Sequence, residues 1–173
     1  QLTSIGYEAF RSTGLTTITI PASVTSIDSG AFYYCNSLTS VLFESGSQLT
    51  SIGSQAFYQS GLTTITIPAS VTSIGSYAFY YCSSLTSVSF ESGSQLSSFG
   101  SGAFYSTGLT NITIPASVTS IDSSAFSGCS TLTSVIFESG SQLTSIGEYA
   151  FYQTGLTTIT IPASVTSISN YAF

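Results

Sequence analysis

A period of forty-seven residues runs through this chain from end to end. Leu2–Gln48, Leu49–Gln95 and Leu96–Gln142 are close copies of one another, and a fourth copy starts at Leu143 and stops unfinished. A fixed period of this size is typical of proteins in which like units stack into a solenoid and each unit contacts only its neighbours. The sequence therefore predicts one elongated array over residues 1–173 rather than a globule.

Each copy divides again into a shorter half of 22 residues and a longer half of 25. Both halves carry Leu or Val, Ile three residues later, an Ala-Phe pair, and a run of the form LxxIxI or LxxVxF. The longer half has one extra residue before that run and two after it, so the insertions fall in predicted turns. We call each half a rung. The rungs start at Leu2, Val24, Leu49, Val71, Leu96, Val118, Leu143 and Val165.

The local pattern within a rung predicts one strand and one short turn. From Leu62 to Ile67 the residues alternate, so that isoleucines point to one face and threonines to the other. Pro68 ends this strand because it lacks a ladder donor. The segment Gly53–Phe57 is too short for more than one turn of α- or 3₁₀-helix. We expect a β-rich solenoid with one parallel β-sheet face and short helical or 3₁₀ turns on the other side.

Apolar residues recur at the same place in successive rungs and should form columns along the array. Neither rung can bury its apolar side chains alone, so stacking has to provide the core. The column of the Ala-Phe pairs is Phe10, Phe32, Phe57, Phe79, Phe104, Phe126, Phe151 and Phe173. A second column is Ile5, Ile27, Ile52, Ile74, Phe99, Ile121, Ile146 and Ile168, in which Phe99 is the one substitution.

The charge balance excludes several kinds of partner. Charged residues make up 5% of the chain, with Arg11 as the only basic side chain against seven acids, and there is no histidine. Nucleic acids and anionic membrane surfaces require clustered Lys and Arg, which this chain lacks. No apolar run has the length of a membrane span, so we expect no membrane insertion. Gln1 lies directly before the first repeat and the chain has no methionine, from which we expect either a piece of a longer array or a product processed from one.

The motifs LxxIxIP, VTSIGxxAFxxC and LTSV resemble the BspA-type leucine-rich repeat, and the resemblance covers essentially the whole chain. It implies a solenoid with a parallel β-sheet along one side. It also implies an extracellular or cell-surface protein that adheres to host proteins, matrix or other cells and has no catalytic activity. The resemblance brings no catalytic or metal-binding residue with it.

The residues themselves also argue against an active site or a cofactor. Cys35, Cys82 and Cys129 lie two rungs apart, roughly 9.6 Å at the usual strand spacing, which is too far for disulfides. We expect them to be buried thiols. One glutamate per copy (Glu44, Glu91, Glu138) cannot build a calcium site and is read as a solvated turn residue. Serine is abundant but lacks a histidine base. We expect no catalytic residue, no metal site and no cofactor.

The outward strand positions form a flat, uncharged, hydroxyl-bearing face. Threonine suits β-structure on its own account, but a regular hydroxyl array could also bind a ligand. The T-x-T pairs resemble those of ice-binding proteins, although they occur only on alternate rungs. The intervening rungs carry Ser40/Leu42, Ser87/Ser89 and Ser134/Ile136. The candidate ligand-binding residues are Thr17, Thr19, Thr64, Thr66, Asn111, Thr113, Thr158 and Thr160.

A tyrosine follows the Ala-Phe pair in most rungs. Tyrosine offers a rigid contact area with a polar tip, which suits protein or glycan partners. Such a ladder could equally serve only to stiffen the rod, and low charge also favours lateral association with further copies. The candidate interaction residues are Tyr33, Tyr58, Tyr80, Tyr105 and Tyr152.

Asn111-Ile112-Thr113 is the sole N-glycosylation sequon, which makes Asn111 a candidate glycosylation site. Together these features predict a non-enzymatic extracellular or cell-surface repeat protein for adhesion, protein–protein interaction, or filament and matrix building. Its expected partners are protein or glycan surfaces, or further copies of itself in a fibre. The alternative is an ice-binding protein that uses the threonine-rich β-face.

Overall fold

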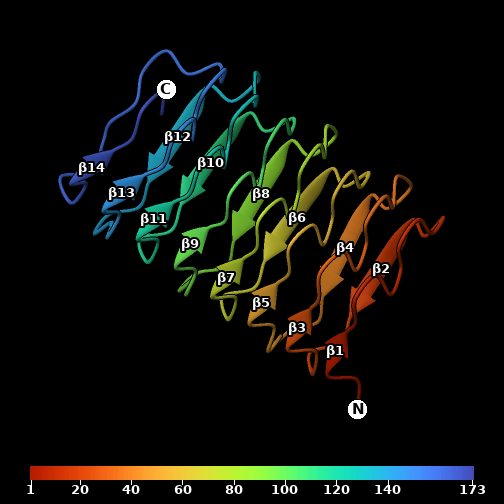
Figure 1. Ribbon diagram of the computed structural model, residues 1–173. Coiled ribbons are helices and arrows are strands. Elements are labelled where there is room, and N and C mark those ends of the chain that lie inside the picture. The colour runs from red at the N-terminus through yellow and green to blue at the C-terminus, as the bar shows by residue number, and fades with distance from the viewer.

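The chain winds into a rod of parallel β-structure. The computed structural model describes all residues from Gln1 to Phe173 and contains fourteen strands and no helix. Figure 1 shows successive rungs side by side along the rod, with the two termini at opposite ends. All strand pairs are parallel and join residues of neighbouring rungs, which confirms the predicted solenoid.

One sheet runs without interruption along the whole rod. It is built from the dipeptide that ends the LTSI or VTSI motif, which is Ser-Ile in every rung except at Ser98-Phe99. Each dipeptide lies over the next, as in Ser51 opposite Ser73 and Ile52 opposite Ile74. The sequence pattern did not lead us to expect strands here. The eight strands are β1 (Ser4–Ile5), β3 (Ser26–Ile27), β5 (Ser51–Ile52), β7 (Ser73–Ile74), β9 (Ser98–Phe99), β11 (Ser120–Ile121), β13 (Ser145–Ile146) and β14 (Ser167–Ile168).

The predicted LxxIxI and LxxVxF strands form a second face, divided into pairs. Within one copy the short and long rungs pair over four residues, as in Thr64–Ile67 against Ser87–Phe90. Between copies the ladder is broken, and a single bond from the Thr63 N–H to the Thr39 carbonyl (3.3 Å) remains. The strands are β2 (Thr17–Ile20), β4 (Ser40–Phe43), β6 (Thr64–Ile67), β8 (Ser87–Phe90), β10 (Asn111–Ile114) and β12 (Ser134–Phe137). The pairs are β2–β4, β6–β8 and β10–β12.

The Ala-Phe segments are turns, so the expectation of helical or 3₁₀ turns there is wrong. Two residues of each complete rung, four positions apart, adopt the left-handed region, as Gln55 (φ 57°) and Gln59 (φ 51°) do. In this turn every second N–H points along the rod: the Phe57 N–H donates to the Ala78 carbonyl of the next rung at 2.7 Å, and the Gln55 and Gln59 N–H groups do the same. In a helix, those N–H groups would instead donate to carbonyl groups of the same segment. Stacking therefore selects this conformation.

The core is the stack of phenylalanines and the aliphatic columns beside it. The rings from Phe10 to Phe173 lie nearly parallel, with successive centroids 5.0–5.4 Å apart. Phe57, Phe79 and Phe104 are fully buried. Phe99, the ring that replaces an isoleucine, packs edge-on against Phe126 at 5.3 Å and fits without opening the column. The predicted columns are thus confirmed.

Hydroxyl groups reinforce the stacking. The Thr50 hydroxyl donates to the Thr25 carbonyl one rung back at 2.9 Å, and the Thr72 hydroxyl donates to the Thr50 carbonyl at 3.1 Å. The same bond recurs in Thr25, Ser97, Thr119, Thr144 and Thr166. The Thr-Ser pair before each isoleucine therefore has a structural role, since its hydroxyl links one rung to the next.

Candidate binding surfaces

The threonine face consists of the eight candidate residues together with the outward residues of β4, β8 and β12. All eight side chains are exposed, with Thr64 and Thr66 on β6 as the central example. Thr158 and Thr160 lie outside any strand, because residues 158–161 do not pair with β12. The geometry thus presents one uncharged surface along the rod.

Two large apolar side chains interrupt the hydroxyls of this face. Leu42 is 59% exposed and lies opposite Thr19, and Ile136 is 57% exposed and lies opposite Thr113. The equivalent position on the long rung between them is Ser89, whose hydroxyl is 2.8 Å from that of Thr66. The face is therefore a mixture of free hydroxyls and isolated apolar contacts.

Most hydroxyls on the threonine face are free of partners within the chain. Apart from Thr66, its threonines take part in no side-chain hydrogen bond, and Asn111 donates only to the neighbouring Thr110 hydroxyl at 3.1 Å. Thr39 and Thr63, just outside the face, instead donate their hydroxyls to carbonyls of the preceding rung. The free hydroxyls are thus available to water or to a partner.

Four of the five candidate tyrosines form a continuous stack. Tyr33, Tyr58, Tyr80 and Tyr105 follow one another with centroids 4.7, 5.2 and 4.6 Å apart and small interplanar angles. Tyr152 stands apart, because Ser127 occupies the rung between, and it contacts Tyr149 edge-on. Since the stacked rings cover one another's faces, the four offer mainly their edges to a partner.

Burial within the stack keeps the phenols neutral. Desolvation raises the pKa of Tyr80 to about 12, and it also raises the pKa of Tyr58 and Tyr33 above the usual value. Neighbouring phenols act in the same direction, because a second phenolate nearby would be repelled. Tyr33, Tyr58 and Tyr80 therefore keep their protons to a higher pH than a tyrosine in water does.

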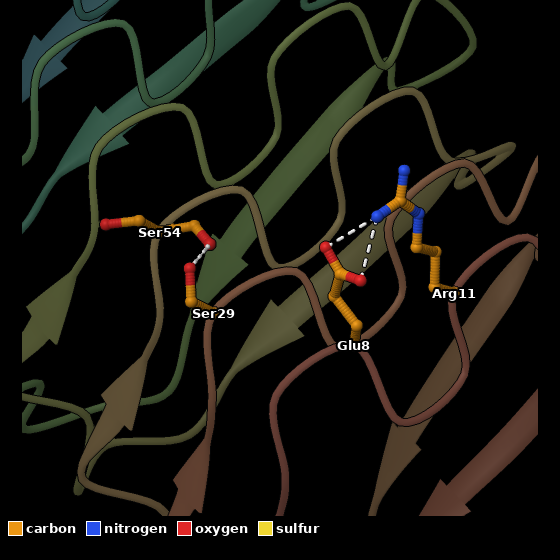
Figure 2. Close-up of polar contacts among 4 residues, drawn as sticks. All are labelled: Glu8, Arg11, Ser29 and Ser54. Atoms are coloured by element: carbon orange, nitrogen blue, oxygen red, sulfur yellow. Dashed lines mark hydrogen bonds and ion pairs between the residues drawn. The ribbon is translucent and has the colours of Figure 1, made fainter.

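The single basic residue is neutralised inside its own rung. Arg11 Nη1 contacts both carboxylate oxygens of Glu8 at 2.7 and 2.8 Å, and its guanidinium lies 5.1 Å from the Tyr33 ring (Figure 2). The hydrogen bond from Arg11 lowers the pKa of Glu8. Figure 2 also shows the Ser29 hydroxyl donating to the Ser54 carbonyl of the next rung. The only basic side chain of the chain is thus already paired with a carboxylate.

The three cysteines are buried and free, as expected, and they also hold neighbouring rungs together. Cys82 Sγ donates to the Phe57 carbonyl at 2.9 Å and lies 3.3 Å from the Ser60 hydroxyl. Burial raises the pKa of Cys82 to about 11. Cys35 and Cys129 make the same contacts in their copies. The 47-residue spacing could not reveal these bonds, which join a residue to one 25 positions earlier.

The glutamates of the long rungs have partners that the pattern did not reveal. Glu91 Oε2 accepts from the Ala69 N–H at 3.0 Å, in the turn of the preceding rung. The same bond joins Glu44 to Ala22 and Glu138 to Ala116. They are exposed, but each one closes a turn. Nowhere do three acidic or cysteine side chains converge as a metal site requires.

None of the chain's segments forms a helix of the length and apolarity that crossing a bilayer requires. Among curated protein sequences there is no significant match. Solved structures give clear matches. The chain is 31% identical to a leucine-rich repeat protein from Bacteroides ovatus, with a TM-score of 0.73 over 96% of this chain and 49% of that one.

Two further structures share the fold. The pneumococcal vaccine antigen PcpA is 24% identical, with a TM-score of 0.76 over 95% of this chain and 57% of that one. A leucine-rich cell surface protein from Faecalibacterium prausnitzii is 27% identical, with a TM-score of 0.53 over 99% of this chain and 60% of that one. The chain thus spans about half to three fifths of the length of these proteins.

The sequence also matches a protein family, described as the BspA type leucine rich repeat region. The match has six copies and covers residues 3–133 and 50–173. Repeats of this type occur mostly in surface proteins that take part in protein–protein interaction, and they are scaffolds that are generally without catalytic activity. The chain is a member of the family of BspA-type leucine-rich repeat proteins.

Proposed function

We propose that this chain is a non-enzymatic, extracellular or cell-surface adhesion scaffold that binds a protein partner through its threonine face. The observation that supports this most is the exposure of two large apolar side chains, Leu42 (59%) and Ile136 (57%), on an uncharged face that is otherwise polar. Exposed apolar side chains together with free hydroxyls provide the two kinds of contact that protein interfaces use. Surface proteins with the same fold support the proposed location.

The geometry also fits a partner without strong charge. The chain has a formal net charge of −6, and its only basic side chain is paired with Glu8. Rigid rungs present the face already ordered, so that little conformational entropy is lost on binding. Adhesion through such a surface should therefore depend only weakly on ionic strength.

The test is adhesion of beads coated with the chain to immobilised fibronectin, fibrinogen, laminin and collagen. A variant carrying Leu42→Ser and Ile136→Ser should lose at least tenfold in binding to whichever protein the parent binds, because two exposed apolar contacts are removed. Leu2→Ser is the matched control, since Leu2 is 55% exposed but lies off the face. Absence of binding to all four proteins, or equal loss in the control, would contradict the proposal.

Location is tested separately. Antibodies against the chain should label unpermeabilised cells or the surrounding matrix of the organism that makes it. Electron microscopy of the native material distinguishes isolated rods from end-to-end fibres, and fibres would favour filament building with further copies as the partner. Labelling that appears only after permeabilisation would overturn the proposed surface location.

Ice binding is a second candidate, because the free hydroxyls of Thr17, Thr19 and Thr64 stand on strands in parallel register. Leu42 and Ile136 interrupt that array. A variant with Thr64→Leu and Thr66→Leu should reduce thermal hysteresis and change ice-crystal shape if this face recognises ice. Identical crystals from parent and variant would rule this function out for the face.

A further inference from the structure

The alternation of short and long rungs hollows out a notch in one edge of the rod. Long rungs make a two-residue turn after their cysteine, at residues 36–37 and 83–84, whereas the short rung between them passes without one. The notch has a volume of about 410 Å³. The residues that line it include Asn36, Gln59, Gly61, Tyr81, Ser83 and Ser84.

Gly61 forms the floor of the notch. A Cβ atom at this position would overlap the carbonyl oxygen of Asn36, so only glycine lets the short rung lie this close to its neighbour. The turns at Asn36 and Ser83 belong to rungs that are two apart, roughly 10 Å at the usual strand spacing. The opening therefore accommodates a flat group about one saturated ring thick.

The polar side chains around the notch are unused by the fold. The amides of Asn36 and Gln59 and the hydroxyls of Ser83 and Ser84 form no side-chain hydrogen bond within the chain, although nearby Ser60 is bonded to Cys82. An amide offers both donors and an acceptor, and a hydroxyl offers both as well. Four such groups around one hollow match a ligand that carries several neighbouring hydroxyls.

Tyr81 supplies an aromatic face. Tyr80 is stacked between Tyr58 and Tyr105, so only its edge is left to meet Tyr81, at a centroid distance of 4.5 Å and an interplanar angle of 79°. The edge of Tyr105 meets Tyr81 at 5.7 Å. Both edges lie against the Tyr81 ring, and Tyr81 as a whole residue is still 43% exposed. An exposed tyrosine beside polar groups suits a ligand with one apolar side.

We propose that this notch binds one neutral pyranose unit of a glycan. The C–H side of a sugar ring would lie on Tyr81, and its vicinal hydroxyls would pair with the amides and serines. No charged residue lines the notch and the chain is acidic overall, so sialylated or sulfated sugars are disfavoured. The site is distinct from the threonine face and does not depend on the adhesion function proposed above.

The next copy of the notch does not repeat these groups. There Ser106 stands in place of Gln59 and Gly128 in place of Tyr81. The fold alone requires neither an amide nor an aromatic ring at these positions, because both rungs stack equally well without them. The sugar site is therefore specific to the notch over Gly61.

The test uses saturation-transfer NMR of the chain with cellotriose, mannotriose and maltotriose, and with 3′-sialyllactose as the anionic comparison. At least one neutral sugar should receive saturation, and Tyr81→Ala should weaken its binding at least tenfold. Ser84→Ala, an exposed change that leaves the core untouched, should weaken it about fivefold through one lost hydrogen bond. Tyr34→Ala is the matched control, because Tyr34 has the same turn position and the same edge contacts one copy earlier.

No saturation transfer to any of the three neutral sugars would overturn the proposal. Equal weakening by Tyr34→Ala and Tyr81→Ala, or equal binding of 3′-sialyllactose, would do so as well. Circular dichroism of each variant shows that the rod is intact. Adhesion by the threonine face should be unchanged in Tyr81→Ala, which separates failure of this site from failure of the adhesion proposal.

Discussion

The thiol of Cys82 donates a hydrogen bond to the backbone carbonyl of Phe57, one rung earlier in the rod, at 2.9 Å. The carbonyl belongs to the Ala-Phe turn and also accepts a hydrogen bond from the Ser60 N–H of its own rung at 3.0 Å. A small apolar side chain in this place would remove the second hydrogen bond of the buried carbonyl and leave it with the Ser60 N–H alone. The cysteine is thus a donor as well as a filler of space, and this explains why a thiol suits the place better than alanine.

This contact predicts thiols that are inert in the folded chain. The thiolate is the reactive form, and burial raises the pKa of Cys82 to about 11. Ellman's reagent at pH 8 should therefore react with none of the three cysteines until denaturant is added. Cys82→Ala should lower the free energy of unfolding by about 1–2 kcal/mol, from the lost hydrogen bond and a small cavity. Rapid labelling of the folded chain would contradict the burial described above.

The glycine of the short rung gives a second prediction, with a control inside the same sequence. Gly61→Ala should cost about 2–3 kcal/mol because its Cβ would overlap the Asn36 carbonyl. Gly14 has the same position in the first rung but no atom within 4 Å of its would-be Cβ. Gly14→Ala should stay within about 0.5 kcal/mol of the parent. Chemical denaturation of both variants measures the difference, and equal effects would refute the close approach of the rungs.

The phenylalanine stack predicts a large loss on truncation. Phe79→Ala removes a fully buried ring that touches Phe57 and Phe104, and we expect a loss of about 3–5 kcal/mol in the free energy of unfolding. Phe10→Ala should cost less, because Phe10 is only partly buried and stacks on one ring instead of two. Denaturant melts of both variants test the order, and the reverse order would show that the stack is not the core.

The tyrosine stack predicts a loss of stability in alkali. The folded-state pKa of Tyr80 is about 12, above the usual 10.0, so the folded chain favours the neutral phenol more than the unfolded chain does. That contribution is fully present below about pH 10 and is lost as the pH rises toward 12. Urea melts should show this decline, and Tyr80→Phe should reduce it. Tyrosinate absorbance should appear at higher pH in the folded chain than in urea, and coincident titrations would refute the burial of the stack.

The sequence was sufficient for the architecture because each rung repeats the same physical demands. The period predicted the column formed by Phe57 and its equivalents. The Ile-Thr alternation predicted β6 and its outward threonines. The expected helical turn at Gly53–Phe57 was wrong. Local sequence preferences do not include the next rung, whose carbonyl groups accept the N–H groups that a helix would use internally. The continuous ladder of Ser51-Ile52 dipeptides was missed for the same reason, since two residues are too few for a strand pattern.

The sequence also predicted some features of the candidate sites and missed others. Exposure of the threonine face followed from alternation alone, and stacking of Tyr58 on Tyr80 followed from their equal positions in successive rungs. The amide of Ala69 bound by Glu91, and the notch over Gly61, depend on how turns of unequal length meet across rungs. Such contacts join residues about 22 to 25 positions apart and leave no local signature.

The division of the second face into β2–β4, β6–β8 and β10–β12 has a consequence for how such rods change in length. On this face each pair of rungs has its own four-residue ladder, and the pairs are joined by single backbone bonds such as that from the Thr63 N–H to the Thr39 carbonyl, although the other sheet continues through every rung. Loss of a single short rung would set two long turns against each other and leave a strand without its mate. Gene duplication and deletion should therefore be tolerated in steps of one whole 47-residue copy, and half-steps should be rare among descendants of this sequence.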